Sequence, residues 1–445
     1  MNAPHPKLSG STEIPVRLST EPYISEAYAR EEKNKLWNKV WQVACREEEI
    51  PEVGDFYTYD ILDQSVIIMR TGDDEIVAHH NACRHRGRRL TEGCGHLRKI
   101  SCPYHGWEWN LKGDNTHVLH PEHWNGALTE DMTRLRSVKV ERWAGYVFVN
   151  FDPDCGSLEA FLGEVPYWLG VFEMEKMRYK WRQWLRMPCN WKSVTEAFIE
   201  GYHAPVTHPQ TAELGGGYVE SSSEGLHGRL FTVGTAAGGI GTSVGMVDAM
   251  DVRKLPYLAL KQQLDTVWSN ATQTFVDAAQ TLPDILSESA TSAEVGAKLF
   301  EVARQMDAAR GVDWPTVDPI HMANVGINWH VFPNTILLPN VTFCLGFRLR
   351  PDGYDPDSCI MEVFALERYP AGQEPETEWE YKPNIHDDSW PLLIKQDFSN
   401  LEAQQRGMHS DAHDGLLPDP RQEACVINFQ RNLAEYMGRN APRPL

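Results

Sequence analysis

The sequence carries two short motifs that decide the fold, Cys83-Arg84-His85-Arg86-Gly87 and Cys102-Pro103-Tyr104-His105-Gly106-Trp107, with sixteen residues between His85 and Cys102. Each motif offers one thiolate and one imidazole from a loop. Two cysteines can hold one iron and two histidines the other iron of a two-iron cluster. The segment therefore predicts a [2Fe-2S] centre with Cys83, His85, Cys102 and His105 as ligands.

This division of ligands is that of a Rieske centre. Neutral imidazoles in place of two anionic thiolates raise the reduction potential of the cluster, so that it accepts electrons from ordinary ferredoxins. The alternative is a structural zinc site. Zinc modules usually repeat Cys-x2-4-Cys and His-x3-5-His, whereas here each half is mixed and the first gap is a single residue. The spacing favours iron.

A second group of candidate ligands follows Asn190-Trp-Lys. Glu196, Glu200 and His203 are spaced by four and three residues, so a continuous helix would carry them on one face. His208 would point elsewhere on that helix. We expect Pro205 to interrupt the helix and let both imidazoles converge on one ion.

Two histidines need an anionic partner to form the facial triad that holds ferrous iron with open positions. Asp397, in a C-terminal amphipathic segment, is the best candidate. Gln396 is neutral and does not compete for this role, whereas Asp387, Asp388 and Glu402 do. Taken alone, the spacing of the two histidines would favour satisfied core residues over metal ligands. However, nearly 300 residues follow the electron-transfer cluster, and they should contain a site that accepts its electrons. This favours a metal site at the histidine pair.

Three further histidines, His117, His120 and His123, lie in one segment with Pro121. The sequence indicates no thiolate or carboxylate arrangement that would complete a metal shell around them. We expect a solvated loop without a metal.

Charge and hydropathy exclude several classes of protein. The net charge of -20 argues against sequence-independent nucleic-acid binding. No apolar run approaches the ~18 residues of a membrane span, and the N-terminal stretch lacks a signal-peptide core. Nine scattered cysteines do not resemble a disulfide framework. We expect a cytoplasmic protein. One group of basic residues around the cluster motifs stands out in this acidic chain, and we call it the basic island: Arg84, Arg86, Arg88, Arg89, Arg98 and Lys99. It would either steer an acidic electron donor or form hydrogen bonds with the cluster loops.

The hydrophobic pattern predicts an α+β chain. We expect an amphipathic helix within 23–46, an antiparallel sheet from 56 to 79, and a strand within 145–151. A helical region at 255–311, broken by Pro283, should cover the pocket. Strands should follow at 326–332, 341–349 and 359–366. Phe198, Val206 and Leu393 neighbour the proposed iron ligands and are candidate pocket walls, although core packing is equally consistent with each.

From about Tyr23 to the C-terminus the chain resembles the large, catalytic subunit of Rieske non-heme iron aromatic-ring-hydroxylating oxygenases. The resemblance rests on the two cluster motifs, on Asn190-Trp-Lys with Glu200-x2-His203-x4-His208, and on the distal Asp397. It implies an N-terminal segment and helix (1–37) packing on the catalytic domain, a β-rich Rieske domain (38–155), and a catalytic domain (156–445) with a large antiparallel sheet flanked by helices.

The resemblance also implies a homotrimer, with or without a small β subunit, in which Glu200 joins His105 of one chain to His203 of the next. Naphthalene-type members have Asp at the position of Glu200 and often Asn at that of Ala197. With these differences we still expect Glu200 to form the electron bridge between subunits. They weaken the expectation that the reaction is a cis-dihydroxylation.

The expected activity is that of a terminal oxygenase. Electrons from an NADH-linked reductase, directly or through a ferredoxin, would reach one mononuclear Fe(II), where O2 hydroxylates an aromatic or alicyclic substrate. Monooxygenation, including O- or N-demethylation, is the alternative with the same residues. A pure electron carrier, whose His203, His208 and Asp397 bind nothing, is a third hypothesis from another class.

Overall fold

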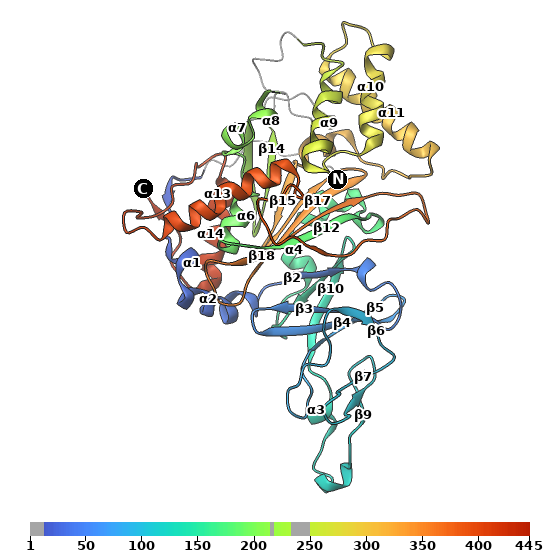
Figure 1. Ribbon diagram of the computed structural model, residues 1–445, viewed down its shortest axis with the longest axis vertical. Helices are drawn as coiled ribbons and strands as arrows, with labels where there is room; N and C mark the ends of the chain where they lie inside the picture. Colours follow the sequence, from blue (N-terminus) through green and yellow to red (C-terminus); the bar gives the residue numbers. More distant parts are fainter. Residues whose placement is uncertain (1–12, 214–217, 233–249) are drawn as a thin grey trace, which may run out of the picture. The chain divides into compact units, whose positions relative to one another are not determined.

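The computed structural model describes residues 13–213, 218–232 and 250–445 (Figure 1). Its internal contacts divide the chain into two units. One holds Glu31–Phe161, and the other holds Leu162–Leu445 together with the N-terminal residues up to Arg30. We call these the cluster unit and the catalytic unit. Residues 31–37, expected with the catalytic domain, thus belong to the cluster unit, while the domain limits 38–155 and 156–445 stay predictions.

The cluster unit is built on an antiparallel sheet of seven strands in the order β2-β11-β10-β5-β4-β3-β6. The strands are β2 (Gln42–Arg46), β3 (Asp55–Ile61), β4 (Gln64–Gly72), β5 (Glu75–His80), β6 (Cys94–His96), β10 (Ser137–Trp143) and β11 (Tyr146–Asn150). A second sheet contains β7 (Ile100–Ser101), β8 (Glu108–Trp109) and β9 (Asn115–His117). The β-rich character expected for this part of the chain is confirmed.

The catalytic unit contains a sheet of eight strands in the order β13-β14-β15-β16-β17-β18-β12-β19. They are β12 (Arg178–Met187), β13 (Val219–Glu224), β14 (His227–Thr232), β15 (Asn328–Val331), β16 (Thr335–Pro339), β17 (Phe343–Pro351), β18 (Cys359–Glu367) and β19 (Glu380–Tyr381). Only the short β12–β19 pair is parallel among the described strands. β15, β17 and β18 are buried along almost their whole length, so both faces of the sheet are covered.

Helices cover this sheet. They include α5 (Val165–Leu169), α6 (Trp191–Ala197), α7 (Ala204–Thr207), α8 (Pro209–Glu213), α9 (Leu255–Val267), α10 (Gln273–Ile285), α11 (Ser292–Ala309), α12 (Pro319–Asn324), α13 (Leu392–Met408) and α14 (Ala424–Met437). In Figure 1, α9, α10 and α11 form one group, and α13 runs from beside α9 to α6 and α1 (Glu21–Ile24). The expected antiparallel sheet flanked by helices is confirmed.

Two local predictions were wrong. The helix expected within 23–46 ends early, because α2 (Glu26–Glu32) continues as a π-turn only to Trp37 and strand β2 begins at Gln42. Val43 pairs with Phe148 of β11, so sheet pairing overrides the helical pattern there. Pro283 lies inside α10 instead of breaking the helical region, and the break follows at 286–291.

Candidate active site and metal centres

The two cluster motifs form two matching loops. Cys83 N–H donates to Arg88 O at 2.8 Å and its carbonyl accepts from Gly87 N–H at 2.9 Å. Cys102 repeats the pattern with Trp107 O at 2.8 Å and Gly106 N–H at 2.9 Å. Both glycines have positive φ, 75° and 70°, which a side chain would strain. The glycine four residues after each cysteine therefore closes each loop around its ligands.

These loops bring the four predicted ligands together. Nδ1 of His85 lies 3.1 Å from Nδ1 of His105. Cys83 and Cys102 are buried, and both burial and the neighbouring Cys102 thiol raise the pKa of Cys83. The two histidines are only half-buried. The donor set of two adjacent thiols and two facing imidazole nitrogens fits a [2Fe-2S] cluster, with the cysteine side inward and the histidine side toward the surface.

Aromatic residues support the loops. Trp107 stacks on His85 with ring centroids 5.2 Å apart, and Tyr104 stacks on His105 at 3.8 Å. Beneath them the two cysteines belong to a hydrophobic core that also contains Phe56, Ile67, Met69, Ile100, Trp107, Trp109 and Leu135. A dry base of this kind limits solvent access to the cysteine side of a cluster.

Much of the basic island is engaged locally. Arg84 donates to Met132 O at 3.2 Å, Arg89 pairs with Asp60 at 2.9 Å, and Lys99 pairs with Glu108 at 2.6 Å. For these residues the structure supports the local role over a free role in steering a donor.

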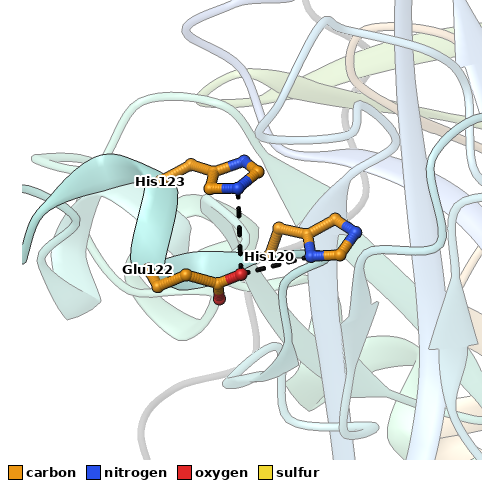
Figure 2. Close-up of side chains that lie close together, drawn as sticks. All are labelled: His120, Glu122 and His123. Atoms are coloured by element: carbon orange, nitrogen blue, oxygen red, sulfur yellow. Dashed lines mark hydrogen bonds and ion pairs between the residues drawn. The ribbon is translucent and has the colours of Figure 1, made fainter.

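A second histidine-rich group lies at the η3 turn (Pro121–Trp124) of the cluster unit (Figure 2). Contrary to the sequence analysis, a carboxylate does join it, because His120 Nδ1 and His123 Nε2 lie 3.2 and 3.9 Å from the Oε1 atom of Glu122. All three side chains are more than half exposed. The ligand atoms of His120, Glu122 and His123 lie within 4.8 Å of one another, so the expected absence of a metal there stays a prediction.

The predicted helical face through Glu196, Glu200 and His203 is wrong. Helix α6 ends at Ala197, and His203 is the N-cap of the separate short helix α7. Pro205 stands in the first turn of α7 instead of interrupting a longer helix. Between the helices the backbone passes so close to Val219 that a Cβ on Gly201 would lie 2.8 Å from the valine Cβ. The turn therefore requires glycine.

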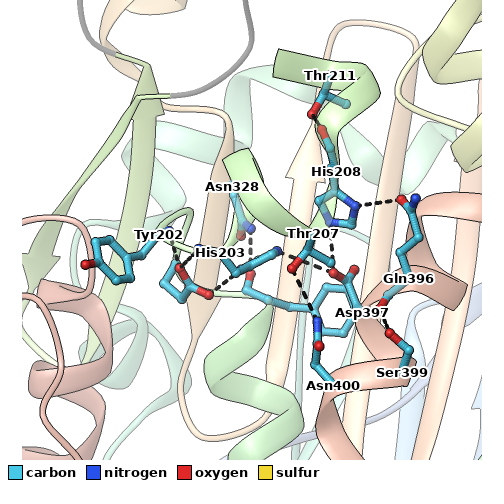
Figure 3. A network of polar contacts seen from close by, with 12 residues as sticks. Tyr202, His203, Thr207, His208, Thr211, Asn328, Gln396, Asp397, Ser399 and Asn400 are labelled. Carbon is cyan, nitrogen blue, oxygen red and sulfur yellow. Dashed lines mark hydrogen bonds and ion pairs between the residues drawn. The ribbon is translucent and has the colours of Figure 1, made fainter. Parts of the chain in front are cut away.

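The turn nevertheless brings the predicted iron ligands together. His203 and His208 lie at opposite ends of α7 and both point toward Asp397 of α13 (Figure 3). Oδ1 of Asp397 is 2.9 Å from Nε2 of His208 and 3.4 Å from Nε2 of His203. The three ligand atoms all lie within 4.8 Å of one another.

Asp397 supplies the test of whether this group fits a metal. Its Oδ1 atom is buried, and no described residue donates a well-directed hydrogen bond to it. A buried carboxylate oxygen without a donor is costly. A cation between this oxygen and the two imidazole nitrogens would satisfy all three atoms, and two histidines with one carboxylate suit ferrous iron. The residues present therefore fit the iron.

The three competing carboxylates are engaged elsewhere. Asp388 pairs with Lys395 at 2.5 Å and Glu402 with Arg406 at 3.5 Å. Asp387 accepts a hydrogen bond from Ser389 N–H at 2.8 Å. Asp397 is the only member of this group within reach of the histidine pair in the described part of the chain.

The two histidines have different partners on their outer nitrogens. Glu200 hydrogen-bonds to Nδ1 of His203 and accepts backbone N–H groups of Tyr202 and His203. Nδ1 of His208 instead faces Oε1 of Gln396 at 2.9 Å. The expectation from the sequence was only that neutral Gln396 does not compete for the anionic role, and its contact with His208 was not predicted. Its position directly before Asp397 was the available signal.

Electrostatics reflect the three-residue group. Burial lowers the pKa of His203, but the neighbouring carboxylates of Asp397 and Glu200 outweigh burial and raise the pKa to about 10. Burial also lowers the pKa of His208, but the Asp397 carboxylate outweighs burial and the pKa is raised. In the absence of a metal, protons would provide the positive charge that this site attracts.

A cavity of about 840 Å³ adjoins these residues. Its walls include Glu196, Glu200, His203, Asp397 and Glu423, and no Lys or Arg is among its described lining residues. Burial raises the pKa of both Glu196 and Glu423 to about 7. The cavity is therefore lined by four carboxyl groups, of which Glu196 and Glu423 are partly protonated near neutral pH.

The three candidate pocket residues, Phe198, Val206 and Leu393, differ in their position relative to this cavity. Val206 lines this cavity and is 85% exposed. Phe198 stacks on Phe347 with centroids 4.4 Å apart, and Leu393 is half-buried on α13. Neither Phe198 nor Leu393 lines the cavity. Their role toward a substrate stays a prediction.

Comparison with known proteins identifies the family. The model of the ring-hydroxylating alpha subunit catalytic domain matches residues 172–439, and that of the Rieske [2Fe-2S] domain matches residues 40–129. The chain belongs to the ring-hydroxylating alpha subunit family. The predicted family, the Rieske cluster and the catalytic domain of the mononuclear iron type are thereby confirmed.

Curated relatives of this alpha subunit include both mono- and dioxygenases. It is 31% identical over 199 residues to the carnitine monooxygenase oxygenase subunit of Escherichia coli K12, covering 44% of this chain and 52% of the relative. It is 30% identical over 212 residues to the biphenyl 2,3-dioxygenase alpha subunit of Rhodococcus jostii RHA1, covering 45% of each. The chain spans about half the length of the curated relatives it matches.

Solved structures share the fold of the alpha subunit. A quaternary ammonium Rieske monooxygenase in complex with L-carnitine superposes with a TM-score of 0.62 at 17% identity, covering 96% of this chain and 97% of that one. Naphthalene 1,2-dioxygenase with bound indole gives a TM-score of 0.60 at 16% identity, covering 95% of this chain and 92% of that one.

Among the described residues, no helix is both long enough and apolar enough to cross a membrane.

Proposed function

We propose that this chain is the terminal oxygenase component of a Rieske non-heme iron oxygenase system. The observation that carries the proposal is the convergence of His203, His208 and Asp397 around an unsatisfied buried carboxylate oxygen. A chain that only carried electrons would have no need of this second group. The cluster loops at Cys83 and Cys102 complete the set of sites that an oxygenase of this kind requires.

The residues have separate roles in this proposal. Cys83, Cys102, His85 and His105 would hold the cluster, and His203, His208 and Asp397 would hold ferrous iron on one side, leaving the other side open. When bound, the cluster supplies electrons and the iron supplies activation of dioxygen. Glu200 would orient His203 by accepting its Nδ1–H, as carboxylates commonly do for metal-bound histidines.

Glu200 also supports a proposal for electron transfer. By its resemblance to the family, it would join His105 of one chain to His203 of the next, in a homotrimer with or without a small β subunit. Its contact with His203 within the chain is one half of such a bridge. The donors would be an NADH-linked reductase and, if the system contains one, a ferredoxin, acting in the cytoplasm.

Two substrate classes are candidates. The first is an aromatic or alicyclic ring, as in hydrocarbon catabolism, consistent with a relative that is a biphenyl dioxygenase. The second is a cationic N-methylated compound that undergoes oxidative N-demethylation. The specific observation in its favour is the cavity next to His203, whose described walls hold four carboxyl groups and no Lys or Arg. Relatives named as carnitine and glycine betaine monooxygenases agree with this second candidate.

The experiment is a substrate panel with a surrogate reductase and 18O2. Both classes of compound are supplied, and oxygen uptake, NADH use and product labelling are recorded. Two labelled atoms in one product would exclude monooxygenation, whereas formaldehyde with one labelled product oxygen supports N- or O-demethylation. His208→Ala serves as the control that must abolish oxygen incorporation. Incorporation that survives in this variant would refute the proposed site.

A further inference from the structure

We propose that Gln396, Gln210 and Gln262 form a relay of amides that fixes the ring of His208 and ties it to helix α9. All three act as positioning residues, since none of them is expected to touch the iron or the substrate. The inference rests on the proposed function, because His208 must be an iron ligand for its ring orientation to matter. It goes beyond that function in assigning roles outside the ligand set.

The first step is the contact with the ligand. Gln396 Oε1 accepts from His208 Nδ1 at 2.9 Å (Figure 3). If Nε2 of His208 binds iron through its lone pair, the proton of the neutral ring must be on Nδ1. An oxygen at Nδ1 stabilises this tautomer, whereas an amide NH2 group would oppose it. Gln396 therefore has to present its oxygen and not its nitrogen.

The second step explains why it does so. Nε2 of Gln210 donates to the same Oε1 atom at 2.7 Å, and the two amides face each other with a longer reverse contact of 3.5 Å from Gln396 Nε2 to Gln210 Oε1. A flip of the Gln396 amide would place two NH2 groups against each other. Gln210 thus holds Gln396 in the orientation that His208 needs.

The third step reaches helix α9. Nε2 of Gln262 donates to the backbone carbonyl of Gln210 at 2.7 Å. Gln210 lies in α8, which follows His208 directly, and the carbonyl of His208 itself accepts from Thr211 at 2.7 Å. Since α9 also contacts α13, which carries Asp397 and Gln396, a displacement of α9 would be transmitted to both sides of the iron site.

The relay makes the two histidines unequal. His203 has the charged partner Glu200, and His208 has the neutral partner Gln396. Carboxylate partners raise the basicity of a metal-bound imidazole more than neutral acceptors do. The chain therefore holds one histidine as a stronger donor and the other as a weaker one whose geometry depends on three amides.

The test compares Gln396→Leu, Gln396→Glu, Gln210→Leu and Gln262→Leu in the full-length protein with its cluster present. The dissociation constant of ferrous iron is measured by competition with a chelator, and the nitric oxide adduct is examined by EPR. Visible absorption of the cluster checks folding. Loss of a partner that orients a metal-bound histidine weakens binding about 10–100-fold, and we expect this for Gln396→Leu. Gln396→Glu retains the acceptor oxygen and should retain tight binding.

Gln210→Leu and Gln262→Leu should weaken iron binding in the same direction by smaller factors and alter the nitrosyl spectrum. Gln263→Leu is the matched control, because Gln263 is the next residue on α9 and accepts from Asn270 at 3.3 Å. Wild-type affinity and spectrum in Gln396→Leu would overturn the inference. A Gln262→Leu variant indistinguishable from Gln263→Leu would overturn the link to α9. Failure of the wild-type protein to bind iron would instead contradict the proposed function.

Discussion

Oδ1 of Asp397 lies 2.9 Å from Nε2 of His208, although helix α13 and the end of α7 are far apart in the sequence. This carboxylate oxygen is buried and lacks a well-directed donor in the described part of the chain. The fold thus holds an anionic oxygen and imidazole nitrogens at separations that only a shared cation or shared protons can stabilise.

Removal of one cluster cysteine should eliminate the cluster. Cys83 is buried, and Cys83→Ala removes a thiolate ligand that the alanine side chain cannot replace. We expect loss of the visible absorption and of the EPR signal of the reduced cluster. Cys94→Ala is the control, since Cys94 is exposed on β6. A cluster that persists in Cys83→Ala, or disappears in Cys94→Ala, would show that the ligands are misassigned.

Glu200→Gln should separate metal binding from electron transfer. Glutamine can still accept the Nδ1–H of His203 but carries no charge. We expect unchanged iron and sulfide contents and a fall of about 10–100-fold in coupled turnover. The direct readout is the rate at which dioxygen and substrate oxidise a prereduced cluster in a single turnover. An unaltered rate would remove Glu200 from the proposed electron path.

Glu196 gives a prediction for pH. Its Oε1 accepts from Tyr23 O–H at 2.7 Å and from Gln430 Nε2 at 2.6 Å. Burial nevertheless raises its pKa from 4.5 to about 7. Because the folded-state pKa is the higher one, the stability that this group contributes is fully present below pH 4.5 and is lost as the pH rises through about 7.

Glu196→Gln removes this titration and keeps an acceptor for both donors. The stability of the wild type relative to the variant should therefore fall as the pH rises from 4.5 to about 7. The rise of the pKa from 4.5 to about 7 corresponds to a decrease of about 3 kcal/mol in the free energy of unfolding between these two pH values. Melting temperatures of both proteins across this range are the measurement. Parallel curves would mean that Glu196 does not change its protonation there.

The grouping of the candidate ligands could be predicted from the sequence because it depends on short spacings within single loops. Cys83 and His85, or His203 and His208, are close along the chain whatever the rest of the fold does. Asp397 was predicted from the chemistry that two histidines require, within a segment that the sequence marks only as amphipathic.

Other features depend on contacts between distant segments and could not be predicted. Helix α6 ends at Ala197, and in the turn that follows Gly201 lies against Val219 of the distant strand β13. The strand at Gln42–Arg46 exists because β11 pairs with it. The relay through Gln396 requires α8, α9 and α13 to meet, and hydrophobic periodicity contains no signal for a hydrogen bond between amides.

The central claim is that one chain holds two separate iron centres. Iron and acid-labile sulfide per chain, measured in the wild type and in His208→Ala after anaerobic reconstitution, test it most directly. We predict about three irons and two sulfides in the wild type, and about two of each in the variant. Two irons in both proteins would contradict the claim and leave a chain that only carries electrons.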